Sequence, residues 1–199
     1  MSTSAAKKEQ LRSELRALRR SFVGSERCRQ EEMIGQQIEV LLSRYTQGRI
    51  GIYLPFDGEV DISFLWEGEL PVITPMNQDS LSSRFVFPVH KKNSELRFVE
   101  PQTWDDSQVL PVANGPTIPL SDLRVMLVPG VAFCPNSGLR LGLGGGHYDR
   151  TLSLCKEKTW RLDAFGVGFS FQQRTDIPRE PWDTPLDGLI SESGIRIFT

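Results

Sequence analysis

The sequence predicts an α/β fold: a single domain spanning residues 1–199, with three layers in which helices cover both faces of a central sheet. Several short segments are apolar at nearly every position, which is typical of strands that are buried on both faces. Helical patterns precede and follow these segments, and this mixture favours a layered α/β domain. Ligands of such domains bind beyond the carboxyl ends of the strands.

Two helices are predicted before the first strand. Residues 7–22 carry an apolar stripe at helical spacing, formed by Leu11, Leu15, Leu18 and Phe22. A series of cations flanks this stripe, formed by Lys8, Arg12, Arg16 and Arg19. A basic series of this kind is commonly a solvated helix face. Gly24 ends the first helix, and a second begins near Ser25 and ends before Gly48.

The rest of the chain is rich in short apolar segments. We expect strands at residues 50–54, 72–74, 84–89, 97–99, 124–128 and 164–169. The stretch 100–123 contains several prolines and Asn114-Gly115, so we expect a long surface connection there. A further helix is predicted at residues 149–158, directly after a cluster of glycines.

Charge and composition exclude several classes of partner. The formal net charge of −2 gives no bulk attraction to nucleic acid or to an anionic membrane, and no apolar run approaches the ~20 residues that span a bilayer. Cys28, Cys134 and Cys155 are widely spaced and form no CxxC motif, which favours a reducing compartment. We therefore expect a cytoplasmic protein, a monomer or weak dimer, whose partner is a small molecule.

The most informative segment is the glycine loop, residues 142–146, with its flanking side chains. Four glycines within five positions let backbone amides converge into a concavity that binds anions, and a helix N-terminus behind them strengthens it. The segment matches neither GxxxxGK[ST] nor GxGxxG. Arg140 and Arg150 bracket the loop and can pair with phosphate, while the carboxylate of Asp149 can hold magnesium. The alternatives are a loop selected for backbone geometry alone and, for Asp149, a helix N-cap.

The segment RLGLGGGHYDRTL resembles the RLGxGGGYYDR signature of the 5-formyltetrahydrofolate cyclo-ligase (5,10-methenyltetrahydrofolate synthetase) family. The resemblance extends along nearly the whole chain. Further matching segments, in the family's order, are Lys8-x-x-Leu11-Arg12, Phe56-Asp-Gly-Glu59-Val-Asp61, Val128-Pro-Gly-Val-Ala-Phe133 and Pro181-Trp-Asp183-x-x-Leu-Asp187. The glycine signature is specific, whereas the other segments are weak individually.

This resemblance implies an ATP- and Mg²⁺-dependent ligase. The family converts 5-formyltetrahydrofolate, with or without a polyglutamate tail, to 5,10-methenyltetrahydrofolate and releases ADP and phosphate. A phosphorylated formyl group is the implied intermediate, so the protein must chiefly position groups and neutralise phosphate charge. The implied fold is similar to that of phosphosugar isomerases and CoA transferases.

The resemblance also implies roles for individual residues. Nucleotide-binding residues would be Lys8, Arg12, Arg140, Gly142, Gly144, Gly145, Gly146, His147 and Tyr148. Of these, Arg140 and Tyr148 would also be catalytic. Asp149 would hold magnesium, with Asp183 as a second candidate that could instead shape a turn. Glu59 would accept hydrogen bonds from the pterin ring, although an exposed turn acid is the alternative, and Phe56 and Trp104 are candidates for stacking on flat rings.

Several positions depart from the family pattern. His147 replaces an aromatic Tyr or Phe, Cys134 replaces an acid, and Gly115-Pro116 stands where Glu-Pro is expected. These changes affect the folate side more than the phosphate loop. Two alternatives therefore stay open: a non-catalytic relative that binds folate or nucleotide, and a small-molecule phosphotransferase that acts on a non-folate acceptor.

Overall fold

The computed structural model describes residues 3–65, 84–100, 103–105, 110–112 and 115–198, with the backbone alone for 103–105 and 110–112. Its longer helices are α1 (Ser4–Ser21), α2 (Ser25–Leu42) and α4 (His147–Glu157). Short 3-10 helices lie at Ser63–Leu65, Leu120–Asp122 and Ser170–Gln172. The strands of the main sheet are β1 (Arg49–Gly51), β2 (Phe85–Val89), β3 (Arg97–Val99), β6 (Thr117–Ile118), β7 (Leu123–Pro129), β10 (Asp163–Val167), β11 (Gly188–Ser191) and β12 (Gly194–Ile197). Two small antiparallel pairs lie outside this sheet: β4 (Thr103–Asp105) with β5 (Leu110–Val112), and β8 (Ala132–Phe133) with β9 (Arg140–Leu141).

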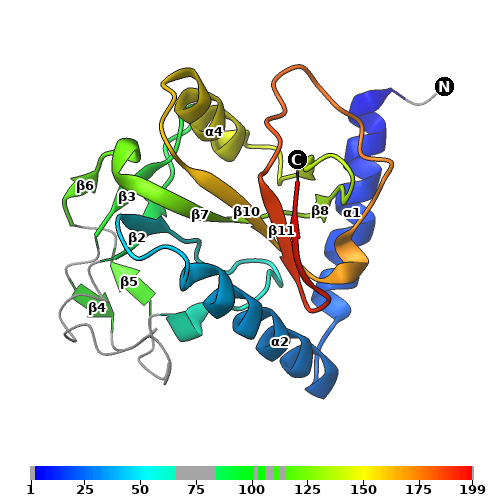
Figure 1. The fold of residues 1–199 in the computed structure, drawn as a ribbon. Helices are drawn as coiled ribbons and strands as arrows, with labels where there is room; N and C mark the ends of the chain where they lie inside the picture. The colour runs from blue at the N-terminus through cyan, green and yellow to red at the C-terminus, as the bar shows by residue number, and fades with distance from the viewer. Residues whose placement is uncertain (1–2, 66–83, 101–102, 106–109, 113–114, 199) are drawn as a thin grey trace.

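Within the described ranges, the main sheet has eight strands in the order β12-β11-β10-β7-β1-β2-β3-β6 (Figure 1). The central strands β11, β10, β7, β1 and β2 run parallel to one another. β12 pairs antiparallel with β11, and β3 pairs antiparallel with both β2 and β6. The carboxyl ends of β1, β2, β7 and β10 therefore meet at one edge of the sheet.

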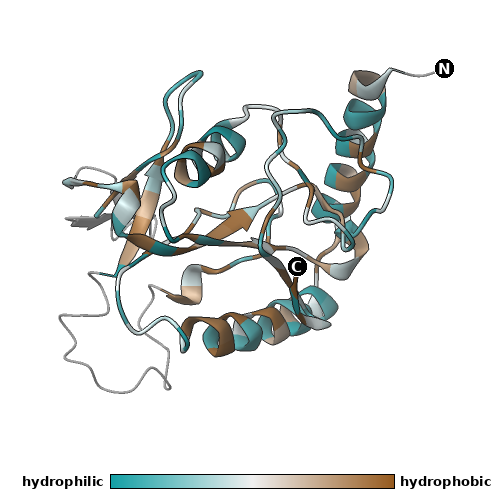
Figure 2. Ribbon diagram, turned by 45° about the horizontal axis from the view of Figure 1, so that its top comes forward, coloured by the Kyte–Doolittle hydropathy of each residue, from teal (hydrophilic) through white to brown (hydrophobic). Residues whose placement is uncertain are grey.

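The two faces of the sheet are covered by different helices. Side chains alternate along β7, so Val125 and Leu127 belong to the core cluster that contains Ile38 of α2, whereas Met126 and Val128 belong to the cluster around α4. Figure 1 places α2 and α4 on opposite sides of the sheet. In Figure 2 the central strands are brown and the helices alternate between brown and teal, as helices with one buried face do. The mixed α/β class is confirmed.

Helix α1 lies beside β8, at the carboxyl edge of the sheet (Figure 1). Its buried residues are Lys8, Leu11, Leu15 and Arg19, so the predicted apolar stripe is correct in its first half only. Leu18 is 45% exposed, because the buried face continues from Leu15 to Arg19, one turn further on. The prediction that Arg19 lies on a solvated face is wrong.

The sequence located most central elements but misjudged the edges. The first strand ends at Gly51 rather than at residue 54, and the stretch 100–123 is not simply a connection, because β6 joins the main sheet through β3. β11 and β12 were not predicted. The strand predicted at 72–74 lies outside the described residues. Among the helices that the structure describes, none is both long and apolar enough to cross a membrane.

Candidate active site

A cavity of about 300 Å³ opens at the carboxyl edge of the sheet. Glu59 reaches it from the loop after β1, His90 from the end of β2, and Gly130 from the end of β7. The glycine loop and the first turn of α4 supply the opposite wall, and Lys8 and Arg12 reach in from α1. The cavity thus occupies the position that the α/β prediction indicated.

The glycine loop adopts a conformation that side chains disfavour. Gly144 and Gly146 have φ values of +101° and +66°, and a Cβ atom on Gly146 would lie 2.7 Å from Nη1 of Arg150. Among the described residues, no acceptor contacts the backbone N–H groups of Gly144, Gly145 and Gly146. α4 begins directly behind them, with Gly146 rather than Asp149 as its N-cap. These free amides form a concavity suited to an anion.

Arg140 is the buried cation of this wall, with its side chain 3% exposed. Its Cζ lies 5.2 Å from the centroid of the Tyr148 ring, and its Nη2 lies 3.1 Å from Oδ2 of Asp149. That ion pair lacks hydrogen-bond geometry, so Nε and Nη2 of Arg140 have no hydrogen-bond partner in the described part of the chain. Buried donors are rarely left unpaired, and a free guanidinium can take two phosphate oxygens.

Lys8 and Arg12 brace the cavity from α1. Nζ of Lys8 donates to Oδ2 of Asp183 at 2.8 Å, and Nε of Arg12 donates to the carbonyl oxygen of Gly142 at 2.9 Å. Arg12 thereby holds the glycine loop against the helix. The same Oδ2 of Asp183 accepts from the backbone N–H of Glu180, so this aspartate also shapes a turn.

The carboxylates fit magnesium only in one mode. Among the described residues, no group of three His, Cys, Asp or Glu side chains is arranged to hold a metal. Asp149 and Asp183 both line the cavity, each already paired with a cation. Magnesium is often held by one or two carboxylates together with substrate phosphates and water. The two aspartates therefore fit a magnesium ion that arrives with a nucleotide.

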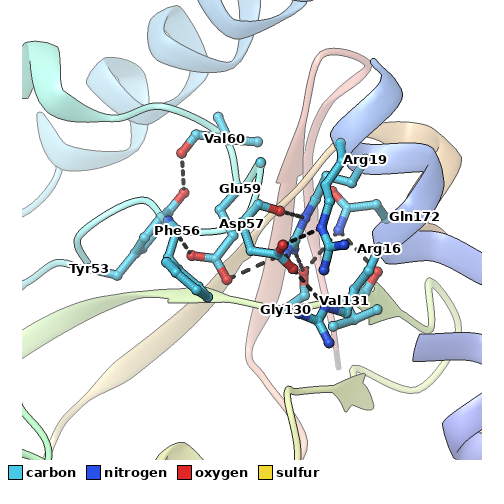
Figure 3. A network of polar contacts seen from close by, with 12 residues as sticks. Arg16, Arg19, Tyr53, Phe56, Asp57, Glu59, Val60, Gly130, Val131 and Gln172 are labelled. Atoms are coloured by element: carbon cyan, nitrogen blue, oxygen red, sulfur yellow. Dashed lines mark hydrogen bonds and ion pairs between the residues drawn. The ribbon is translucent and has the colours of Figure 1, made fainter. Parts of the chain in front are cut away.

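Glu59 is the buried acid of the cavity and is 9% exposed. Its Oε2 accepts from the backbone N–H of Phe56 at 3.1 Å, and its Oε1 lies 3.9 Å from Nη1 of Arg19 (Figure 3). Burial raises the pKa of Glu59 to about 7, although the charge of Arg19 opposes the rise. Burial also raises the pKa of Tyr148, and the charge of Glu59 adds to that shift. Glu59 is thus a buried acid, in contrast to the alternative of an exposed turn residue.

One predicted substrate residue, Phe56, is not brought to the cavity. Phe56 is 65% exposed and is not among the residues that line it. The backbone of Trp104 lies in β4, but its side chain lies outside the described residues. The other predicted site residues all line the cavity: Lys8, Arg12, Glu59, Arg140, Gly142, Gly144, Gly145, Gly146, His147, Tyr148, Asp149 and Asp183.

Sequence reasoning missed six lining residues: His90, Pro129, Gly130, Leu141, Leu143 and Trp182. His90 could have been found, because it directly follows a predicted strand and strand ends carry sites. Its ring meets that of His147 edge to face, with the centroids 5.2 Å apart. Nδ1 of His147 also lies 2.9 Å from the carbonyl oxygen of Ser94, so the ring ties α4 to the loop after β2.

Comparisons with known proteins agree with this geometry. The model of the 5-formyltetrahydrofolate cyclo-ligase family matches residues 4–192. A 5-formyltetrahydrofolate cyclo-ligase of Haemophilus influenzae is 31% identical over 92% of this chain and 97% of its own length, and one of Escherichia coli K12 is 31% identical over 83% and 92%.

Two solved structures have a similar fold. A 5,10-methenyltetrahydrofolate synthetase of Aquifex aeolicus superposes with a TM-score of 0.72 at 26% identity, covering 96% of this chain and 92% of its own. One from Mycoplasma pneumoniae also gives a TM-score of 0.72, at 25% identity, covering 93% and 98%. The resemblance inferred from the glycine loop is confirmed, and this chain belongs to the 5-formyltetrahydrofolate cyclo-ligase family.

Proposed function

We propose that this chain catalyses the ATP-dependent cyclisation of 5-formyltetrahydrofolate to 5,10-methenyltetrahydrofolate, with release of ADP and phosphate. The observation that carries the proposal is the buried guanidinium of Arg140, which has unpaired donors beside the free amides of the glycine loop. A triphosphate is the ligand that this wall suits best. Membership of the cyclo-ligase family supports the same reaction.

In this proposal the phosphates lie between the glycine loop and α1. The amides of Gly144, Gly145 and Gly146 and the guanidinium of Arg140 bind phosphate oxygens, and Lys8 and Arg12 supply further positive charge from the other side. Asp149, with Asp183 as a second candidate, would hold a magnesium ion that neutralises charge on the phosphates.

The folate lies at the opposite end of the cavity. Glu59 faces the cavity with its Oε1 free of hydrogen bonds among the described residues, so it can accept from the donor edge of a pterin ring. Tyr148 packs under Arg140 and has an electrostatic interaction with Glu59, which puts it between the two proposed subsites.

The chemistry needs activation of a poor electrophile. The formyl oxygen attacks the γ-phosphorus and ADP leaves, so the oxygen becomes part of a good leaving group. Nitrogen 10 then attacks the formyl carbon and loses its proton, and cleavage of the carbon–oxygen bond releases phosphate. Arg140 neutralises the charge that moves during both steps, and the cavity walls hold the reacting groups in contact.

The direct test mixes the purified protein with 5-formyltetrahydrofolate, ATP and magnesium and follows the near-ultraviolet absorbance of the methenyl product. We expect absorbance to grow only when both ATP and folate are present, with one ADP formed per product. ADP formation on another acceptor without methenyl product would indicate a phosphotransferase. Binding of both ligands without turnover would indicate a non-catalytic relative, and either result would reject the proposal.

Other features remain predictions from the sequence. These are the likeness to phosphosugar isomerases and CoA transferases, the single-domain organisation, the monomeric or weakly dimeric state, the polyglutamate tail of the substrate and the cytoplasmic location. Because Phe56 is exposed outside the cavity, we do not assign it to the pterin ring.

A further inference from the structure

Arg19 is the most deeply buried cation of α1, with its side chain 1% exposed, yet it does not line the cavity. All three of its nitrogens donate hydrogen bonds (Figure 3). Nε reaches the carbonyl oxygen of Asp57 at 2.9 Å, Nη2 reaches Oδ2 of Asp57 at 3.2 Å, and Nη1 reaches the carbonyl oxygen of Gly130 at 3.0 Å. One guanidinium therefore joins α1 to the loops that follow β1 and β7.

A neighbouring amide fixes the same junction. Nε2 of Gln172 donates to the carbonyl oxygens of Gly130 and Val131, at 2.9 and 3.0 Å. Gln172 follows β10, so Gly130 accepts from groups on two other elements. Gly130 is thus held from two sides, and the position of Arg19 is set by fixed acceptors rather than by a mobile partner.

The charge of Arg19 is not cancelled by Asp57. Oδ2 of Asp57 also accepts from Nε of Arg16 at 2.6 Å, and its Oδ1 accepts from Nε of Arg20 at 2.5 Å. Three guanidinium groups thus share one carboxylate. The surplus positive charge lies beside Glu59, whose Oε1 is 3.9 Å from Nη1 of Arg19.

Arg19 is the one cation within 4 Å of the Glu59 carboxylate among the residues that the structure describes. The other groups whose charge acts on or is acted on by Glu59 are acids and phenols: Asp57 and Tyr53 from its own segment and Tyr148 from α4. The two phenols stay neutral because their own pKa values are raised, while burial and the charge of Asp57 favour the protonated carboxyl of Glu59. Arg19 opposes them, and it does so without a direct hydrogen bond that would occupy Oε1.

We propose that Arg19 is a positioning residue for Glu59, favouring its ionised form against the effect of burial and leaving its free oxygen available to the donor edge of the substrate ring. A carboxylate accepts hydrogen bonds on both oxygens, whereas a protonated carboxyl presents a donor on one of them. Loss of Arg19 therefore weakens folate binding through Glu59 and leaves the nucleotide end unaffected. This inference rests on the proposed folate role of Glu59.

The test is a double-mutant cycle read by ligand binding. Arg19→Gln and Glu59→Gln are made singly and together, and Kd is measured by calorimetry for 5-formyltetrahydrofolate and for ATP. Arg20→Gln is the matched control, because Arg20 contacts the same Asp57 but is 55% exposed and makes no ion pair with Glu59. We expect R19Q to weaken folate binding about fivefold at pH 7, because a rise of about one unit from a pKa of about 7 lowers the ionised fraction of Glu59 from roughly one half to roughly one tenth, with no change for ATP.

The pH dependence separates this role from a merely structural one. The carbon-13 resonance of the Glu59 carboxyl, assigned by its loss in E59Q, should titrate about one unit higher in R19Q. The defect in folate binding should shrink as pH rises, because Glu59 then ionises without help. R19Q should have no further effect in the E59Q background, and R20Q should behave as the wild type.

Two results would overturn the positioning role: an unchanged Glu59 pKa in R19Q, or a loss of folate affinity that is equally large in E59Q. If E59Q alone leaves the folate Kd unchanged, the folate role of Glu59 is wrong. The titration still measures how far Arg19 lowers the pKa of Glu59. If R19Q does not fold, Arg19→Lys decides, because one ammonium cannot reach all the acceptors. Because lysine keeps the positive charge, the role is supported if the folate Kd changes only in step with the Glu59 pKa and not in E59Q, and it is overturned if the folate Kd weakens while the Glu59 pKa stays that of the wild type.

Discussion

Nζ of Lys8 lies 2.8 Å from Oδ2 of Asp183, and this ion pair joins α1 to the segment before β11 across the mouth of the cavity. Both side chains are nearly buried, at 11% and 13% exposed. Burying two charges is costly, so such a pair stabilises a fold little, but removal of one partner leaves the other uncompensated.

We therefore predict that Lys8→Met lowers the free energy of unfolding by about 3 kcal/mol, and that the double variant K8M/D183N recovers part of this loss. Urea denaturation measures both. Lys7→Met is the control, because the Lys7–Asp176 pair is 3.5 Å long and roughly half exposed on both sides, so its loss should cost under ~1 kcal/mol. Equal losses for K8M and K7M would contradict the prediction.

Arg140→Ala should abolish most activity without unfolding the protein. Nε and Nη2 of Arg140 have no hydrogen-bond partner among the described residues, so the substitution removes few hydrogen bonds, although it leaves Asp149 without its ion-pair partner. The transition state loses a bidentate partner for phosphate. We expect kcat to fall by roughly 10²- to 10³-fold, as for removal of one electrostatic contact, while the protein stays folded with a free energy of unfolding lowered by at most about 3 kcal/mol, since Asp149 loses its partner. Steady-state kinetics and calorimetry decide, with Arg196→Ala as a surface control. Retained turnover in R140A would remove Arg140 from the site.

Gly146→Ala should impair the phosphate end through the backbone. The φ of +66° disfavours alanine, and the new Cβ would lie 2.7 Å from Nη1 of Arg150, so we expect a loss of about 1–2 kcal/mol in stability and a higher KM for ATP. Gly194→Ala is the matched control, because its φ is +120° with no atom within 4 Å of the new Cβ. It should lose stability while its KM for ATP stays that of the wild type. A KM effect of the same size in both variants would refute the loop assignment.

Glu59→Gln should change how stability depends on pH. The pKa of Glu59 is about 7 in the folded protein, raised by burial from 4.5, so folding favours the protonated carboxyl. The stability that the protonated Glu59 carboxyl contributes to the fold is fully present below pH 4.5 and is lost as pH rises to about 7. The free energy of unfolding of E59Q, relative to that of the wild type, should therefore rise by about 3 kcal/mol as pH increases through this window. Urea denaturation at several pH values measures it.

The control for this comparison is Glu32→Gln, which changes an exposed glutamate on α2. Its difference from the wild type should stay flat between pH 4.5 and 7. A flat difference for E59Q as well would mean that the folded protein accommodates the ionised carboxylate without cost.

The central strands and the glycine loop could be predicted because their signals are local. Continuous apolar runs marked β7 and β10, and four close glycines before a helix marked the anion concavity. β11 and β12 have four residues each, and their apolar positions are too few to distinguish strand from turn. β6 has two residues and, among the described strands, joins the sheet only through β3, so its pairing depends on tertiary contacts rather than on a local sequence pattern.

The sequence allowed the residues of the site to be predicted from their types, but it did not allow their contacts with one another to be predicted. Lys8 was recognised as a cation on α1, but its partner Asp183 is 175 positions away and nothing local pairs them. Arg19 was assigned to a solvated face, because a basic series that flanks an apolar stripe is commonly exposed to water. Its burial depends on carbonyl oxygens of Asp57 and Gly130 that only the folded loops present.

The buried face of α1 starts and ends with a cation, and this has a consequence for synthesis on the ribosome. Lys8 on this helix is paired with an aspartate that is translated 175 residues after it. A nascent chain that has reached only β10 already contains α1, the glycine loop and the first turn of α4, but it lacks Trp182 and Asp183 of the cavity wall. The buried ammonium of Lys8 therefore has to wait for its carboxylate partner until residue 183 has been made.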